Sequence, residues 1–218
     1  YIHRSNAAAA TTWVSVYGDM GLKPTYVKAA FEYAYDELKK QNVQNKVTLF
    51  YNDYDTYFSV DDELALISYI NEGEEAKICG GIGMQSHVDI KRPTLEEYGN
   101  ALKAFINAGL EVQITELDIT INFDTDDTDG RTPTYAYKNE KETDADQAAF
   151  TKDFIKQIVD IQKNRDKTIS PKGITGITVW GISDQTSWRG SCKPLFFTRK
   201  SVRVKDETTG KYKTVYSY

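Results

Sequence analysis

The chain has 218 residues, of which 40% are hydrophobic and 12% aromatic, and this is enough for one large domain with a hydrophobic core. The formal net charge of -5 leaves no basic stripe to neutralise phosphates, which excludes a typical nucleic-acid-binding protein. No apolar run approaches the ~20 residues needed to span a bilayer, and the first residues lack the apolar middle of a signal peptide. We therefore expect neither nucleic acid nor membrane as a partner.

The first part of the chain alternates between helical and β-rich patterns. From Pro24 to Lys40, apolar residues recur on one helical face. The β-rich run "KVTLFYNDYD" follows, and then "SVDDELALISYINEG" repeats the helical spacing and stops at Gly73. The run "AKICGGIGMQSH" is the next predicted strand.

The second part continues this alternation. Thr94 and Glu97 form a T-x-x-E capping box for a helix that should end near Gly109. The strand "EVQITELDI" follows, then a helix from about 144 to 164, and then "KGITGITVWGISD" as a fourth apolar strand. The remainder, from about Ser191, is expected to be irregular or a hairpin.

Four helix-strand pairs in this order predict a parallel sheet covered by helices, and both doubly wound sheets and barrels fit. "GGIGMQ" lacks the G-x-G-x-x-G pattern and precedes a histidine, so we expect no dinucleotide cofactor. Polar or aromatic clusters end all four strands: "YNDYD", "MQSH", "TELD" and "WGISDQTSW". Because active sites lie at the carboxyl ends of parallel strands, these clusters favour the barrel.

Two features suggest metal or disulfide chemistry only weakly. Cys79 and Cys192 allow one disulfide at most and lack the paired spacing of metal ligands, so separate thiols are favoured. The acidic stretch "FDTDDTDG" at 123–130 fails the EF-hand pattern, because Thr125 would be the first ligand and Ala136 the twelfth. A solvated loop is favoured there over a cation site, and no metal is expected.

Two carboxylates in the strand "VQITELDIT" at 112–120 are the first candidates for chemistry. Alternation of side chains along a strand predicts that Ile114, Glu116 and Asp118 share one face, while Thr115 and Leu117 point the other way. The alternative is that the acids merely meet solvent or an arginine at the end of the strand.

His87 closes the neighbouring predicted strand at a matching height. A carboxylate beside an imidazole fixes its tautomer and raises its pKa, which is a common way to orient an active site. A single histidine, however, is more often structural.

Aromatic and amide side chains surround these acids in the predicted arrangement. Flat rings combined with hydrogen-bonding groups suit a carbohydrate cleft, although tryptophans are also common core residues. The side chains concerned are Tyr51, Asn52, Tyr54, Gln85, Trp180 and Trp188.

Four motifs carry a family resemblance: "LFYNDYD", "GIGMQSH", "ITELDI" and "WGISDQTSWRG". In this order they resemble the last four strands of the glycoside hydrolase family 10 xylanases. The resemblance runs from about Trp13 to about Phe197 and includes the helix "YVKAAFEYAYDELKK". It implies that residues 1–218 are the C-terminal part of a single catalytic domain, about half of a (β/α)8 barrel, that hydrolyses β-1,4-xylan with retention.

The resemblance also implies roles for individual residues. Glu116 would be the nucleophile, and His87 would pair with Asp118 to hold and tune it. The implied substrate-binding residues are Gln85, Trp180 and Trp188 as sugar contacts and Tyr51 and Asn52 on the leaving-group side. As a separate hypothesis, the loop after the nucleophile strand, which runs to about Thr143, is long enough to place Tyr135 or Tyr137 near substrate.

Retention requires a second carboxyl group ~5 to 5.5 Å from the nucleophile, on the opposite side of the scissile bond. Asp118 is unsuitable, because it lies about 6.6 Å further along the same strand, and Asp53 does not match the family acid. In the family, the acid/base glutamate belongs to an Asn-Glu pair that ends the fourth strand. Neither Asn71-Glu72, which closes a helix, nor Asn139-Glu140, in a loop, fits that place.

We therefore expect the acid/base to lie upstream, in an N-terminal half barrel that is absent here, and the isolated chain to be inactive. Its open sheet edges favour pairing with that half or with a homodimer mate. Two alternatives are a non-catalytic carbohydrate-binding or scaffold fragment, and another retaining barrel glycosidase. The resemblance implies secretion or display at the cell surface or in the periplasm, because xylan is too large to enter a cell.

Overall fold

The computed structural model describes residues 16–17, 21–121, 142–197 and 200–217. The acidic stretch 123–130 and the two tyrosines Tyr135 and Tyr137 lie outside the described residues. No helix among those that are described is both long and apolar enough to cross a membrane.

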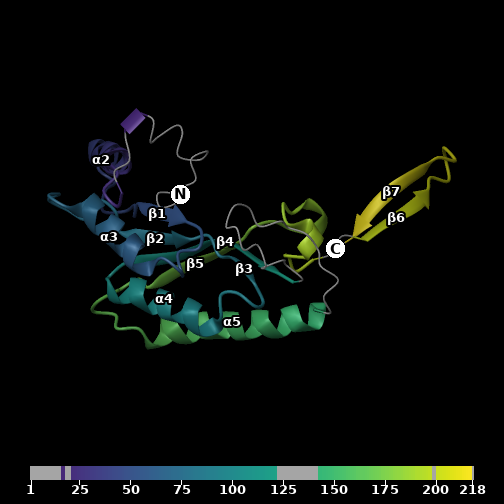
Figure 1. The fold of residues 1–218 in the computed structure, drawn as a ribbon. Helices are drawn as coiled ribbons and strands as arrows, with labels where there is room; N and C mark the ends of the chain where they lie inside the picture. Colours follow the sequence, from purple (N-terminus) through teal and green to yellow (C-terminus); the bar gives the residue numbers. More distant parts are fainter. Residues whose placement is uncertain (1–15, 18–20, 122–141, 198–199, 218) are drawn as a thin grey trace.

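Helices and strands alternate as predicted (Figure 1). In chain order they are α2 (Thr25–Lys40), β1 (Phe50–Asp53), α3 (Val60–Asn71), β2 (Gly81–Met84), β3 (His87–Asp89), α4 (Leu95–Asn107), β4 (Glu111–Thr120), α5 (Asp144–Asn164), β5 (Ile174–Val179), the 3-10 turns η1 (Asp184–Thr186) and η2 (Gly190–Cys192), β6 (Lys200–Lys205) and β7 (Tyr212–Ser217).

The first five strands form one parallel sheet in which neighbours in the chain are neighbours in space. β1 pairs with β2, while β2 and β3 both pair with β4, and β5 pairs with the other edge of β4. β2 and β3 are two parts of one run, separated at Gln85 and at Ser86, whose φ is +64°. Four strand positions therefore follow one another, as expected for a segment of a parallel barrel.

Local capping fixes where the helices begin and end. Thr94 accepts a hydrogen bond from the Glu97 amide, and the Glu97 side chain accepts one from the Thr94 amide, which confirms the predicted capping box of α4. Thr143 and Asp146 form the same arrangement at the start of α5. Just after α4, Gly109 has a φ of +75°, a left-handed conformation that glycine adopts without strain.

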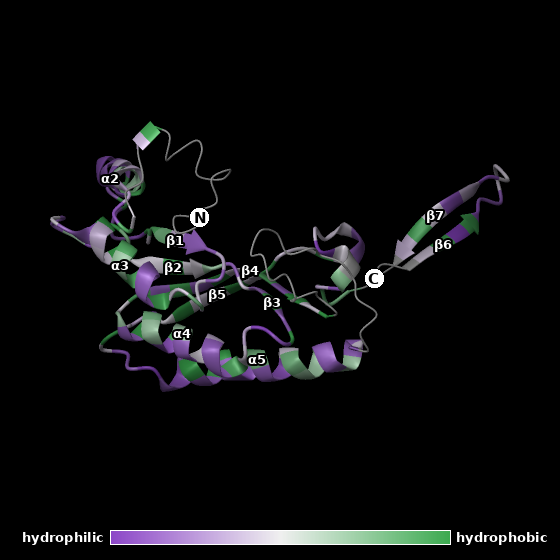
Figure 2. Ribbon diagram, in the orientation of Figure 1, coloured by the Kyte–Doolittle hydropathy of each residue, from purple (hydrophilic) through white to green (hydrophobic). Residues whose placement is uncertain are grey.

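The hydrophobic core lies between the sheet and its helices, and α4 and α5 run along one side of the strands (Figures 1 and 2). Burying these apolar side chains is the main stabilising contribution, at about 25 cal/mol per Å² of apolar surface. The largest fully buried members include Leu66, Ile70, Ile82, Tyr98, Leu102, Phe105, Ile114, Leu117, Ile119 and Phe154.

A β-bulge interrupts β4 at Thr115 and Glu116. From Met84 to His87 the neighbouring run advances three residues, while β4 advances four, from Ile114 to Asp118. The pairing with β5 shifts over the same stretch of β4. The predicted face pattern is therefore wrong for Ile114 and Thr115, because an extra residue reverses the alternation. Ile114 is fully buried in the core, whereas Thr115 and Glu116 both contact Asn52.

The two cysteines and the last strands complete the fold. Cys79 and Cys192 are both buried and form no disulfide with each other. β6 and β7 form an antiparallel hairpin that stands apart from the sheet and its helices (Figure 1), in agreement with one of the two expectations for this region.

Candidate active site

A polar cluster lies at the carboxyl ends of β1 and β2 and beside the second half of β4. Glu116 and Asp118 come from β4, His87 from the start of β3, and Asn52 from β1. The β4 bulge turns the Glu116 side chain to the face that Asn52 occupies, and bulges often re-aim a side chain beside an active site. Separate strands thus deliver the cluster members to one edge of the sheet.

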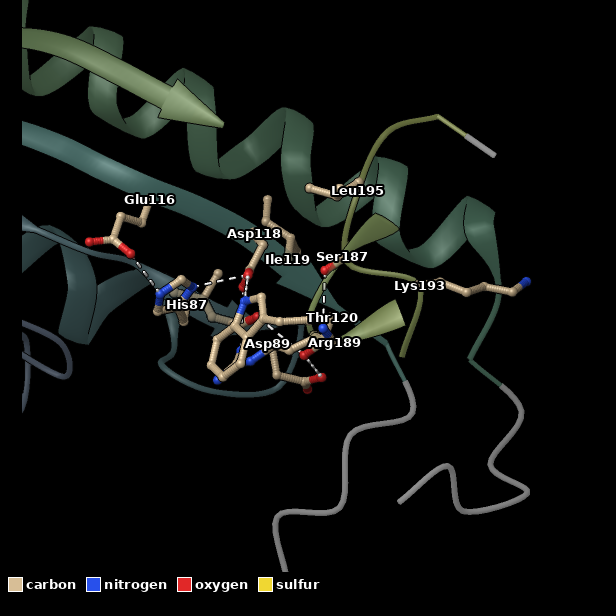
Figure 3. A network of polar contacts seen from close by, with 12 residues as sticks. His87, Asp89, Glu116, Asp118, Ile119, Thr120, Ser187, Arg189, Lys193 and Leu195 are labelled. Carbon is tan, nitrogen blue, oxygen red and sulfur yellow. Dashed lines mark hydrogen bonds and ion pairs between the residues drawn. The ribbon is translucent and has the colours of Figure 1, made fainter. Parts of the chain in front are cut away.

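The His87 ring bridges the two carboxylates (Figure 3). Its Nε2 lies 3.3 Å from Glu116 Oε2, and its Nδ1 lies 3.0 Å from Asp118 Oδ2. The ring thereby links the two acids, because each of its nitrogens faces one carboxylate.

Asp118 anchors this arrangement from a completely buried position. Besides its contact with His87, it accepts a hydrogen bond from Trp188 Nε1 at 3.0 Å, and Arg189 Nη1 lies 3.4 Å from its second oxygen. The Arg189 guanidinium also lies 4.6 Å from the centre of the Trp188 ring. Because its carboxylate is fully buried among these donors, Asp118 is suited to hold its neighbours, whereas the Glu116 side chain is still 16% exposed.

Glu116 is held on its other oxygen by Asn52. Asn52 Nδ2 donates to Glu116 Oε1 at 3.2 Å, while Asn52 Oδ1 accepts from Thr115 Oγ1 at 2.6 Å. On the adjacent strand, Gly83 leaves the space that the amide needs, because a Cβ there would overlap Asn52 Oδ1. Thr115, Gly83 and Arg189 were not predicted from the sequence. The register of β1 with β2, which sets Asn52 opposite Gly83, was the missing signal.

Tyr51 is not brought into this cluster. Its neighbour Asn52 faces Glu116, whereas the Tyr51 ring packs against the hydrophobic core and its hydroxyl donates to Asp53 Oδ2 at 2.8 Å. Burial, followed by the charges of Asp53 and Glu63, raises the pKa of Tyr51. The same surroundings raise the pKa of Glu63 to about 7, first through burial and then through Asp53.

Trp180 and Trp188 lie at the surface and not in the core. Their exposed fractions are 47% and 51%. The edge of Trp188 meets His87, with ring centres 4.9 Å apart, and the Trp180 amide donates to Leu117. Gln85 contributes through its backbone, where its carbonyl accepts from the Glu116 amide at 3.0 Å.

The described part of the chain also holds a cavity away from this cluster. A cavity of about 390 Å³ lies at the amino ends of the strands, but its Glu111 carboxylate already accepts from Thr48, Thr175 and Lys172. Within the described ranges, no group of three His, Cys, Asp or Glu side chains is placed to hold a metal ion.

Comparison with known proteins places the chain in a family. The sequence model of Glycosyl hydrolase family 10 matches residues 3–209. Endo-1,4-beta-xylanase A of Butyrivibrio fibrisolvens is 39% identical over 201 residues, covering 92% of this chain and 41% of that protein. The bifunctional endo-1,4-beta-xylanase XylA of Ruminococcus flavefaciens is 31% identical over 196 residues. That alignment covers 86% of this chain and 16% of XylA. The chain thus spans less than half of these relatives.

Solved structures agree with this match. The N-terminal endo-1,4-beta-D-xylanase 10B of Clostridium thermocellum, in complex with xylohexaose, has a TM-score of 0.63 and 28% identity. The alignment covers 85% of this chain and 31% of that one.

Proposed function

Because the chain belongs to glycosyl hydrolase family 10, which the match over residues 3–209 shows, we propose that it is the nucleophile-bearing C-terminal part of a retaining endo-1,4-beta-xylanase. The observation that carries this proposal is the position of Glu116. A bulge turns this carboxylate to the carboxyl edge of the sheet, and His87 and Asn52 each hold one of its oxygens.

In the proposed reaction, Glu116 attacks the anomeric carbon of a xylose unit and the glycosidic oxygen leaves with a proton. Water then hydrolyses the covalent glycosyl-enzyme and restores the carboxylate. His87 and Asn52 each hold one oxygen of the Glu116 carboxylate, and the buried Asp118, which is held by Trp188 and Arg189, fixes His87. Fixing the attacking group in this way lowers the entropic part of the barrier.

The proton donor is proposed to come from the other half of the barrel. Asp118 is completely buried and lies on the same strand as Glu116, so it does not oppose the nucleophile. Retention needs a carboxyl group across the scissile bond. The isolated chain is therefore proposed to be inactive until a family 10 N-terminal half closes the barrel.

Exposed apolar side chains at the edge of the sheet support the N-terminal half of the barrel as a partner. In β5, Ile177 and Val179 are 40% and 37% exposed, and Trp180 and Ile182 follow them at the surface. Unpaired sheet edges and exposed apolar side chains favour association. The N-terminal half is the proposed occupant, with a homodimer mate as its substitute. Since xylan is too large to enter a cell, the proposed place of action is outside the cell or in the periplasm.

The test is xylan hydrolysis by this chain alone, by the chain mixed with an N-terminal half of a family 10 barrel, and by the same mixture carrying Glu116→Gln. We expect reducing ends to be released only by the mixture of the unsubstituted chain with the N-terminal half. Activity of the isolated chain would show that an acid within it protonates the leaving group. Xylan binding without turnover in every mixture would favour the non-catalytic binding fragment instead.

A further inference from the structure

The β6–β7 hairpin has no role in the site described above. Six cross-strand pairs join its strands, from Lys200 with Ser217 to Lys205 with Tyr212. Figure 1 shows it beyond the carboxyl ends of the sheet strands, standing away from the rest of the fold. Residues 201–205 and 207–216 are all exposed. An isolated two-stranded hairpin is marginally stable in water, so a surface of this kind calls for an explanation.

The two faces of the hairpin differ. Directly paired residues in an antiparallel ladder share a face. On one face Val202 opposes Val215, with Val204 beside them, which supplies cross-strand apolar packing. The other face, here called the tyrosine face, carries Ser201, Arg203, Lys205, Tyr212, Thr214 and Tyr216. Hydrophobic and hydrophilic residues accordingly alternate along the hairpin (Figure 2).

The tyrosine face combines two exposed rings with hydrogen-bond donors. Tyr212 and Tyr216 are 60% and 50% exposed, and they stand four residues apart on one strand, about 13 Å along it. The Arg203 guanidinium lies 5.3 Å from the centre of the Tyr212 ring, a cation–π contact that orients both groups. Flat rings spaced along a strand, with hydroxyl and guanidinium groups between them, suit an extended sugar chain.

The charge of the hairpin also indicates which chemical class of ligand it binds. Residues 200–217 contain five Lys or Arg and two Asp or Glu, whereas the whole chain has a net charge of -5. The hairpin is thus a local basic element on an acidic protein, which attracts acidic groups of a ligand. Lysines and Arg203 along both strands also discourage the addition of another protein strand at these edges.

We propose that the tyrosine face binds an acidic polysaccharide, one whose backbone sugars stack on Tyr212 and Tyr216 and whose uronic-acid side groups meet Arg203 and Lys205. The choice of a xylan backbone rests on the proposed function. On that basis the ligand is glucuronic-acid-substituted xylan, and the hairpin would hold it near the carboxyl edge of the barrel.

The test measures binding of the full chain to insoluble glucuronoxylan and to the same polymer with its carboxyl groups reduced. All proteins carry Glu116→Gln, so that no hydrolysis interferes. The double variant Tyr212→Ala/Tyr216→Ala and the single variant Arg203→Gln are compared with Val215→Thr on the opposite face. Cross-strand order in each variant is checked by NMR.

We expect the double variant to bind glucuronoxylan about tenfold or more weakly, since lost ring stacking costs a comparable factor. Arg203→Gln should weaken the preference for the acidic over the reduced polymer, since Lys205 remains, and Val215→Thr should leave binding unchanged. Equal binding by the tyrosine double variant and its parent would overturn the inference, as would stronger binding to single-stranded DNA than to glucuronoxylan. Because binding is measured without turnover, a failure of the hydrolysis test leaves this result readable on its own.

Discussion

At the residue scale, the candidate site depends on how Glu116 is held. The sequence predicted that Glu116 and Asp118 face the same way and that His87 lies beside them, and the structure has all three in contact. It could not predict the contact between Asn52 and Glu116. That contact depends on a bulge in β4, and an insertion of one residue into a pairing register leaves no periodic signal in one strand's sequence.

Gly83 should matter for activity although it touches no acid. A Gly83→Ala substitution would place a Cβ against Asn52, overlapping its Oδ1 and lying 3.1 Å from its Cβ and Cγ. Asn52 must then move and release Glu116 and Thr115. We expect kcat of the closed barrel on xylan to fall about 10- to 100-fold, because a small misplacement of a reacting group is costly.

The matched control is Gly176→Ala on β5, where an added Cβ would make ordinary contacts of 3.8 and 3.9 Å with Gln113. Thermal unfolding of both variants separates misplacement from loss of fold. Unchanged kcat in Gly83→Ala would contradict the role given to Asn52.

Glu63 should make folding stability depend on pH. Its pKa is about 7 in the folded chain against 4.5 for the free side chain, because burial and Asp53 disfavour its charge. A raised carboxyl pKa stabilises the fold below about pH 4.5, and this contribution is lost as pH rises towards 7. Glu63→Gln should therefore match the parent near pH 4 and exceed it by up to about 3 kcal/mol near pH 8.

Urea unfolding between pH 4 and pH 8 checks this, with Asp61→Asn, an exposed acid of the same helix, as the control. If the gap between Glu63→Gln and the parent stays constant over this range, the raised pKa is wrong.

At the scale of elements, the sequence was informative wherever chemistry is local. The capping box of α4, the span of α5 and the order of helices and strands were all predicted, because capping and periodicity depend on neighbouring residues. The division of one run into β2 and β3 was not predicted. It depends on Ser86, whose positive φ is accompanied by a hydrogen bond between its hydroxyl and that of Tyr98.

Thr94 offers a direct measure of such local control. Thr94→Ala removes the hydroxyl that accepts from the Glu97 amide at 3.1 Å, leaving an unsatisfied helix N-terminus. We expect a loss of about 1 kcal/mol in the free energy of unfolding. Thr94→Ser keeps the acceptor and should retain most of the stability, as followed by chemical denaturation. Equal losses in the two variants would mean that the methyl group, and not the cap, is responsible.

At the scale of the whole molecule, the chain is a segment of a larger architecture. Family membership and the likeness to solved family 10 structures confirm the predicted (β/α)8 class. The parallel sheet, with successive strands adjacent and α4 and α5 along one side, is the corresponding part of that fold (Figure 1). Composition and alternation alone left doubly wound sheets open, since both folds share the same local pattern.

The central claim is that Glu116 is the nucleophile of a retaining reaction completed by the other half of the barrel. The most direct measurement is mass spectrometry of the reconstituted barrel after inactivation with a 2-deoxy-2-fluoro xylobioside, which forms a slowly hydrolysed glycosyl-enzyme. The account predicts one added xylobiosyl group on the peptide that contains Glu116, and none in Glu116→Gln. A label on another carboxylate of the chain, or turnover with no covalent adduct at all, would contradict it.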